Sequence, residues 1–427
     1  MFAMRVLSMG ISFLFVPFYL SKIETNEYGI MIALMSVTGW INSIDVGFGN
    51  GIRNKLTELN SSGNLGEVKT YVSSAYFGVF IYMLLILVVL LTLNRFISIS
   101  QFIGLGTSRE SEIRCIFDYL IIITGSNFVL GIFNTIMLSL HKTFIPSIIN
   151  FITQLITAFT LIIAVKYYND SSLRTLTLIN ALPPLMVLGL FSLLYFKFIN
   201  PGYAPNKDHI KAKHIREILF VGSKFFVLQI ITLILMNLTT FLIMKITGPQ
   251  FVVKYNITTR YLELIWFVFG IIITPMWSST KDAFVNHDFT WIKSTVNKLL
   301  ILGVVMSFFG LLMVVVADFV FDFWLGKNID FKITQREMFP VLFYYIFRMF
   351  YQIFGYVINA SQKLNAQLKI TLISAIFFVP FTVYFGNEFG YIGIIWVVAF
   401  FQLVNWIWAR IQFSYIVNNS GSSFWHR

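Results

Sequence analysis

The chain has 427 residues, of which 57% are hydrophobic and only 12% are charged. Soluble domains carry about 25% charged residues, so this composition excludes an ordinary soluble protein and indicates an all-α polytopic membrane protein. The formal net charge of +12 does not indicate nucleic-acid binding, because excess lysine and arginine in a membrane protein normally sets topology and contacts membrane lipids.

Residues suited to other chemistry are few and scattered. The single cysteine, Cys115, excludes an internal disulfide, and the five histidines show no metal-ligand spacing. The glycine-rich run 47–51 is followed by Ile52 and fits neither nucleotide-binding pattern, GxGxxG or GxxxxGK[ST]. We therefore expect no metal, no cofactor and no catalytic residue. The driving energy is expected from the membrane potential, from substrate consumption or from an ion gradient, with H⁺ or Na⁺ as the coupling ion.

About twelve apolar stretches follow one another along the chain, each close to the roughly 20 residues that cross a hydrocarbon core about 30 Å thick. The first lacks the small-residue pattern of signal-peptide cleavage, so we expect it to be retained as a span. Little of the chain remains for a soluble catalytic domain. The predicted spans are 2–21, 29–48, 72–94, 116–139, 144–165, 175–196, 218–244, 251–275, 295–317, 339–360, 368–385 and 389–415.

A basic connector lies between the sixth and seventh predicted spans and carries five lysine or arginine residues between positions 197 and 216. Short basic loops stay in the cytoplasm. Because the number of spans is even, this orientation puts both termini in the cytoplasm. The connector also divides the chain into a six-helix bundle at 1–196, a cytoplasmic linker at 197–217 and a second six-helix bundle at 218–427.

Charged residues occur inside two predicted spans of the second half. Arg260 and Glu263 lie in the eighth span and Arg348 in the tenth. A charge at the bilayer centre costs about 2.5–3.5 kcal/mol on insertion scales, so these side chains should face protein or water. Asn256 shares a helix face with Arg260, and Gln352 shares one with Arg348. These stripes predict a polar cavity between helices.

The embedded charge is mostly positive, which favours an anionic substrate. Lys224 lies closer to the cytoplasm and adds a further cation. An alternative interpretation is that Arg260 and Glu263, three residues apart, satisfy each other, and that the amides only join helices. The first half has weaker polar stripes of the same kind, at Asn127, Asn134, Asn150 and Gln154.

Three segments resemble one known family. The run Asp45-Val-Gly-Phe-Gly-Asn-Gly-Ile-Arg53-Asn-Lys55 closes the second span and looks like the signature of the polysaccharide-unit flippases, the Wzx-type O-antigen translocases. Residues 17–22 followed by 27–29, and residues 221–226, are also similar to that family. The span count and the central division fit the same family over nearly the whole chain.

The resemblance implies a fold of two six-helix bundles in a MATE-like V around a central cavity. It implies a bacterial inner-membrane flippase that moves oligosaccharide repeat units on undecaprenyl pyrophosphate to the periplasmic leaflet. A polysaccharide polymerase and a chain-length regulator are the expected protein partners, beside membrane lipids. On this hypothesis the diphosphate and sugars meet Arg260, Arg348, Lys224, Gln352 and Asn256, Glu263 modulates Arg260 or exchanges a proton, and Asp45 with Arg53 latches the cytoplasmic gate.

Two other functions stay open. A cation-coupled multidrug or small-molecule exporter of the same fold should line its cavity with carboxylates, whereas Glu263 is the acid clearly in mid-membrane. A membrane-embedded polysaccharide polymerase, the enzyme alternative, needs a large outer loop, whereas 94–115 spans only about 20 residues. We therefore expect a transporter and not an enzyme.

Overall fold

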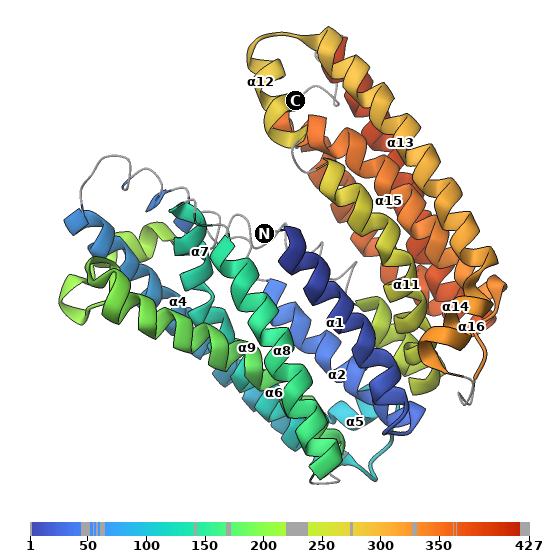
Figure 1. The fold of residues 1–427 in the computed structure, drawn as a ribbon, viewed down its shortest axis with the longest axis horizontal. Helices are drawn as coiled ribbons and strands as arrows, with labels where there is room; N and C mark the ends of the chain where they lie inside the picture. Colours follow the sequence, from blue (N-terminus) through green and yellow to red (C-terminus); the bar gives the residue numbers. More distant parts are fainter. Residues whose placement is uncertain are drawn as a thin grey trace. The chain divides into compact units, whose positions relative to one another are not determined.

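The computed structural model describes most of the chain as α-helix (Figure 1). The described residues are 2–43, 52–53, 55–56, 59, 65–140, 142, 144–167, 172–218, 238–273, 276–326, 331–361, 363 and 365–418. No strand occurs within these ranges. The chain divides into two compact units, Met1–Leu233 and Ile234–Arg427.

The first unit is built around α6 (Glu110–Leu130), which packs against α2, α4 and α9. A second set of contacts joins α8 to α1 and to α9 (Figure 1). The predicted span 116–139 is interrupted at Gly131, where α6 ends and α7 begins. The remaining helices of this unit are α1 (Phe2–Leu20), α2 (Thr25–Ser43), α4 (Leu65–Phe96), α5 (Ile99–Phe102), α7 (Ile132–Ser139), α8 (Phe144–Tyr167) and α9 (Leu173–Leu194).

Large apolar side chains cover the outside of these helices. Leu85 of α4 is 63% exposed, and Leu193 of α9 is 70% exposed. Such faces are unfavourable in water but favourable against lipid tails. In the part of the chain that is described, eight helices are long and apolar enough to cross a bilayer. The protein is therefore a multi-pass membrane protein.

Ion pairs join the helix ends at one edge of the first unit. Arg109, just before α6, pairs with Glu27 of α2 and with Glu112, the latter at 2.8 Å. The hydrogen bond to Glu27 raises the pKa of Arg109, so this guanidinium stays charged. Arg95 at the end of α4 pairs with Asp118 of α6 at 2.8 Å. These contacts fix α2, α4 and α6 relative to one another.

The basic connector folds onto α4. It forms three short turns, η1 (Tyr195–Ile199), η2 (Pro201–Tyr203) and η3 (Lys207–His209). The backbone N–H of Asn206 donates to Ser73 Oγ at 3.0 Å, and that of Lys211 donates to Ser74 Oγ at 2.9 Å. This segment is thus an ordered part of the first unit.

The second unit is built around α15 (Gln335–Ser361), which packs against α11, α12, α13 and α16. Two short helices, α12 and α14, were not expected from the sequence because they are only 10 and 9 residues long and span nothing. The other helices are α11 (Pro249–Ile273), α12 (Met276–Val285), α13 (Phe289–Val315), α14 (Ala317–Leu325) and α16 (Asn365–Val417), preceded by a helical segment at Leu238–Thr247.

The chain reverses direction inside α16. Its 53 residues would measure about 80 Å as one straight helix. Gly390 instead has φ 65° and ψ −157°, a conformation that favours glycine. The rings of Phe378 and Phe401 meet edge to face with centroids 5.6 Å apart, although 23 residues would separate them by about 34 Å in a continuous helix. The label α16 therefore covers two antiparallel segments, in the places of the predicted spans 368–385 and 389–415.

The all-helical membrane fold is thus as predicted. The number twelve, the cytoplasmic position of both termini and the boundaries 1–196, 197–217 and 218–427 stay predictions.

Candidate functional site

Arg348 lies near the middle of α15 and is held by aromatic rings. Its Nη1 donates to the hydroxyl of Tyr344, one turn earlier, at 2.8 Å. Its guanidinium carbon lies 4.3 Å from the centre of the Trp266 ring, which α11 supplies. Such cation–π contacts contribute about 2 kcal/mol or more when desolvated. Among the described residues Arg348 forms no ion pair, so its charge is positioned without being neutralised.

Arg260 and Asn256 lie on α11, one turn apart. The Nε of Arg260 donates to Asn256 Oδ1 at 3.1 Å, and both side chains are half-buried. This places the predicted pair on one face of α11. The amide thereby orients the guanidinium on this helix face.

Glu263 lies on the same helix, one turn further along, and its side chain is exposed. No hydrogen bond or ion pair to Glu263 occurs within the described ranges. The alternative that Arg260 and Glu263 satisfy each other is therefore not the arrangement found. The charges of Glu263 and Arg348 both act electrostatically on Tyr255 and Tyr345.

The packing of α11 against α15 places these groups on two neighbouring helices of one unit. Two guanidinium groups and one carboxylate leave a net charge of about +1 when all are ionised. Partial burial of Arg260 and Arg348 limits solvent screening of the two positive charges. Chemically, this arrangement suits an anion with several oxygen atoms, because a guanidinium can donate two parallel hydrogen bonds to a phosphate.

The other predicted site residues have different outcomes. Gln352 is half-buried on α15, one turn after Arg348. Arg53 is exposed, in a short helical stretch of the first unit. Asp45 and Lys224 lie outside the described residues, so the predicted latch and the cytoplasmic cation stay predictions.

Sequence reasoning missed part of the support around this cluster. Tyr255 of α11 interacts with Tyr344 and Arg348. In the sequence, the feature that could have identified Tyr255 is only an aromatic residue five positions before Arg260. A second missed feature is the Lys254 ion pair with Glu337 of α15, at 3.0 Å. Glu337 also accepts a hydrogen bond from the backbone N–H of Thr334 at 2.6 Å.

The polar stripe of the first half is less organised. Within the described ranges, Asn127 Oδ1 and Asn134 Oδ1 are buried without a hydrogen-bond partner, while Asn150 is exposed on α8. An unpaired buried amide oxygen costs free energy.

Comparisons with known proteins bear on the fold and on the class of protein. No protein-family model matches the sequence. The chain is 21% identical over 370 residues to a candidate O-antigen export protein of Yersinia pseudotuberculosis, covering 84% of this chain and 82% of the relative. It is 19% identical over 412 residues to a candidate O-antigen transporter of Salmonella typhimurium strain LT2, covering 94% and 92%.

Solved structures show the same fold. An inward-facing multidrug resistance transporter of the MATE family, in the MOP superfamily, matches with a TM-score of 0.73 at 14% identity, covering 99% of this chain and 96% of that one. The lipid II flippase MurJ, in an inward closed conformation, matches with a TM-score of 0.71 at 14% identity, covering 100% and 93%. The predicted MATE-like fold and the predicted resemblance to polysaccharide exporters are both confirmed.

Proposed function

We propose, from the fold shared with MATE transporters and MurJ and from the cationic groups of α11 and α15, that this protein is a lipid-linked oligosaccharide flippase. Its substrate is an oligosaccharide repeat unit of O-antigen or a similar surface polysaccharide on undecaprenyl pyrophosphate. It moves the unit from the cytoplasmic to the periplasmic leaflet by alternating access. The relatives named for O-antigen export support this substrate class.

The observation that carries the proposal is the Arg348 guanidinium, held within a membrane span by Trp266 and Tyr344. A charge in a membrane span is costly and is therefore a functional-site indicator. On this proposal Arg348 and Arg260 bind the diphosphate, with Asn256, Gln352 and Lys224 contributing further polar contacts. The aromatic rings beside Arg348 offer faces on which sugars can stack.

The polar side chains of α11 and α15 reduce the main free-energy cost of moving a sugar through the membrane. A sugar hydroxyl that enters hydrocarbon without a hydrogen-bond partner costs a few kcal/mol. The half-buried amides and hydroxyls of α11 and α15 reduce that cost, while the isoprenoid tail stays in lipid. Polymerase and chain-length regulator are the protein partners that this function needs.

The charge of the substrate assists its export. Outward movement of an anion from a negative cytoplasm is favoured by about 2.3 kcal/mol per charge per 100 mV. Glu263, whose carboxylate is exposed and without an ion pair among the described residues, is the group for H⁺ or Na⁺ coupling. The Asp45–Arg53 latch at the cytoplasmic gate belongs to the same proposal.

The same fold supports a second function, a cation-coupled multidrug exporter, because a MATE transporter is among the structural neighbours. Organic cations need acidic partners, and Glu263 is the acid of the α11–α15 cluster. The net positive charge of that cluster favours the flippase. A polysaccharide polymerase is the weaker alternative.

The test is deletion in the native host. We expect undecaprenyl-linked units to accumulate facing the cytoplasm and the surface polymer to be lost. The wild-type gene should remove the accumulation and restore the polymer. Normal surface polymer together with increased drug sensitivity would instead identify the multidrug exporter. Linked units that reach the periplasmic face but stay unpolymerised would identify the polymerase.

A further inference from the structure

Two adjoining hollows lie on the first unit, between α4, α6 and the basic connector. The first encloses about 300 Å³ and the second about 320 Å³, and both are lined by Phe80 and Val129. Because they share these two residues, we treat them as one feature, called the α4–α6 groove. Its other lining residues are Met83, Leu84, Leu87, Gly125, Ser126 and Leu130 in the first hollow, and Ser73, Tyr76, Phe77, Pro205, Asn206, Lys207 and Ile210 in the second.

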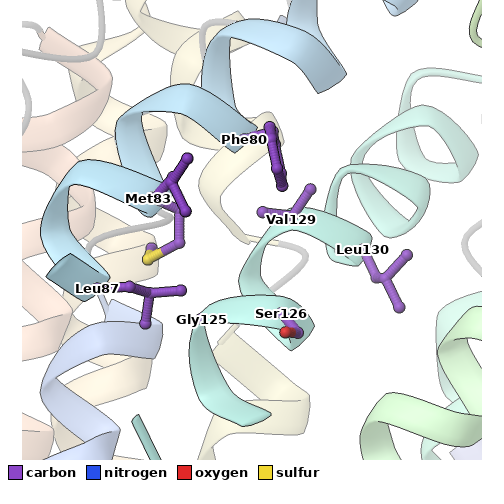
Figure 2. A pocket seen from close by; sticks show the side chains of 8 residues that line it. Phe80, Met83, Leu87, Gly125, Ser126, Val129 and Leu130 are labelled. Carbon is purple, nitrogen blue, oxygen red and sulfur yellow. The ribbon is translucent and has the colours of Figure 1, made fainter. Parts of the chain in front are cut away.

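One end of the groove is apolar. Figure 2 shows Met83 and Leu87 of α4 on one side of the hollow and Val129 of α6 on the other. Ser126 is the polar residue that lines this end. Gly125 keeps the groove open, because a Cβ at this position would approach Leu87 Cδ2 to 2.7 Å. Such a lining suits a hydrocarbon chain.

The other end is polar and basic. Lys207 and Asn206 line it from the connector, and Ser73 and Tyr76 line it from α4. The Tyr76 hydroxyl is buried and has no hydrogen-bond partner among the described residues, so it keeps an unused donor beside the groove. The connector is fixed here by the bond from Asn206 N–H to Ser73 Oγ, so Lys207 is held at the groove mouth.

The length of the groove matches one leaflet. From Ser73 to Leu87 the lining advances fourteen residues along α4, which is about 21 Å of helix axis. Half of a bilayer about 40–45 Å thick, headgroup regions included, is also about 21 Å. A chain that begins at the polar end and follows the groove would therefore end near the bilayer midplane.

We propose that the α4–α6 groove binds one anionic phospholipid, with an acyl chain along Met83, Leu87 and Val129 and the phosphate at Lys207 and Tyr76. Basic pockets at the cytoplasmic ends of membrane helices recognise anionic lipid headgroups through charge. The lipid accepts a hydrogen bond from the buried tyrosine and fills the hollow that Gly125 leaves. This site is separate from the α11–α15 cluster and does not depend on what that cluster transports.

The experiment measures lipid retained by the purified full-length protein. The protein is incubated with equal amounts of phosphatidylglycerol and phosphatidylcholine in detergent, and bound lipid is counted by native mass spectrometry. We expect one phosphatidylglycerol to be retained by the wild-type protein. Lys207→Gln and Tyr76→Phe should each lower its retention at least fivefold, and Val129→Trp should abolish it by filling the groove.

Two matched controls separate the groove from general effects. Lys213→Gln removes the same charge from the same basic segment without lining the groove. Leu193→Trp introduces the same bulky side chain at a lipid-facing position of α9. Both should keep retention within twofold of wild type. Equal retention of phosphatidylglycerol and phosphatidylcholine by the wild-type protein would overturn the proposal. Equal losses of phosphatidylglycerol in Lys207→Gln and Lys213→Gln would also overturn it. So would displacement of phosphatidylglycerol by equimolar undecaprenyl phosphate. Lys207→Gln changes an exposed side chain, so its result does not depend on whether Val129→Trp folds.

Discussion

Arg348→Gln is the substitution that tests the proposed site most directly. It keeps a polar, hydrogen-bonding side chain on α15 but removes the charge that Trp266 and Tyr344 hold in place. A guanidinium can give two charge-assisted hydrogen bonds to a phosphate, each contributing about 1.5–3 kcal/mol. The loss is therefore at least about 3 kcal/mol, which at 1.4 kcal/mol per tenfold is a factor of more than about 100 in affinity.

The assay is translocation of a fluorescent undecaprenyl-pyrophosphate oligosaccharide in proteoliposomes, with its affinity measured separately by titration. We expect Arg348→Gln to weaken binding by about 100-fold and Arg348→Lys to restore part of it, because lysine keeps the charge but lacks the planar fork. Arg410→Gln removes an exposed arginine of α16 and is the matched control, with wild-type binding. Binding by Arg348→Gln within threefold of wild type, at equal protein level, would refute the assignment.

Three further predictions concern the packing that supports the site. Glu337→Gln leaves Lys254 without its 3.0 Å partner and should lower the free energy of unfolding by about 3 kcal/mol, measured by thermal unfolding. Lys332→Gln breaks a 3.9 Å pair that is 77% and 58% exposed and should cost less than about 1 kcal/mol; equal effects of the two substitutions would contradict the reasoning. Gly393→Ala should prevent the reversal in α16, because a Cβ there overlaps the backbone oxygen of Phe385, and the yield of folded protein after membrane expression should fall. Gly270→Ala, with open space around its Cβ, should give the wild-type yield. Glu27→Gln removes a partner of Arg109 and should lower the melting temperature more than Glu24→Gln, and an unchanged melting temperature would show that this ion pair does not hold α2 against α6.

The sequence alone determined the class and the helical fold of this protein. A membrane span must satisfy its own backbone hydrogen bonds, so a long apolar run predicts a helix with little help from distant residues. The predicted span 144–165 lies within α8, and 251–275 nearly coincides with α11. Local hydropathy also marked Arg260 and Arg348 as unusual, because a charge inside an apolar run is detectable without any tertiary contact.

Only the tertiary structure decided what these residues contact. Trp266 lies over Arg348 although the two are 82 positions apart, and that contact depends on how α11 and α15 are rotated against each other. Spacing on one helix suggested a pair between Arg260 and Glu263, but rotamers and neighbouring helices gave Arg260 the Asn256 amide and left Glu263 exposed. The α4–α6 groove likewise depends on how α4, α6 and the connector pack together, and on the absence of a side chain at Gly125 where the two helices meet. Hydropathy depends on each residue's own chemistry, whereas pairing and cavities arise from packing between distant segments.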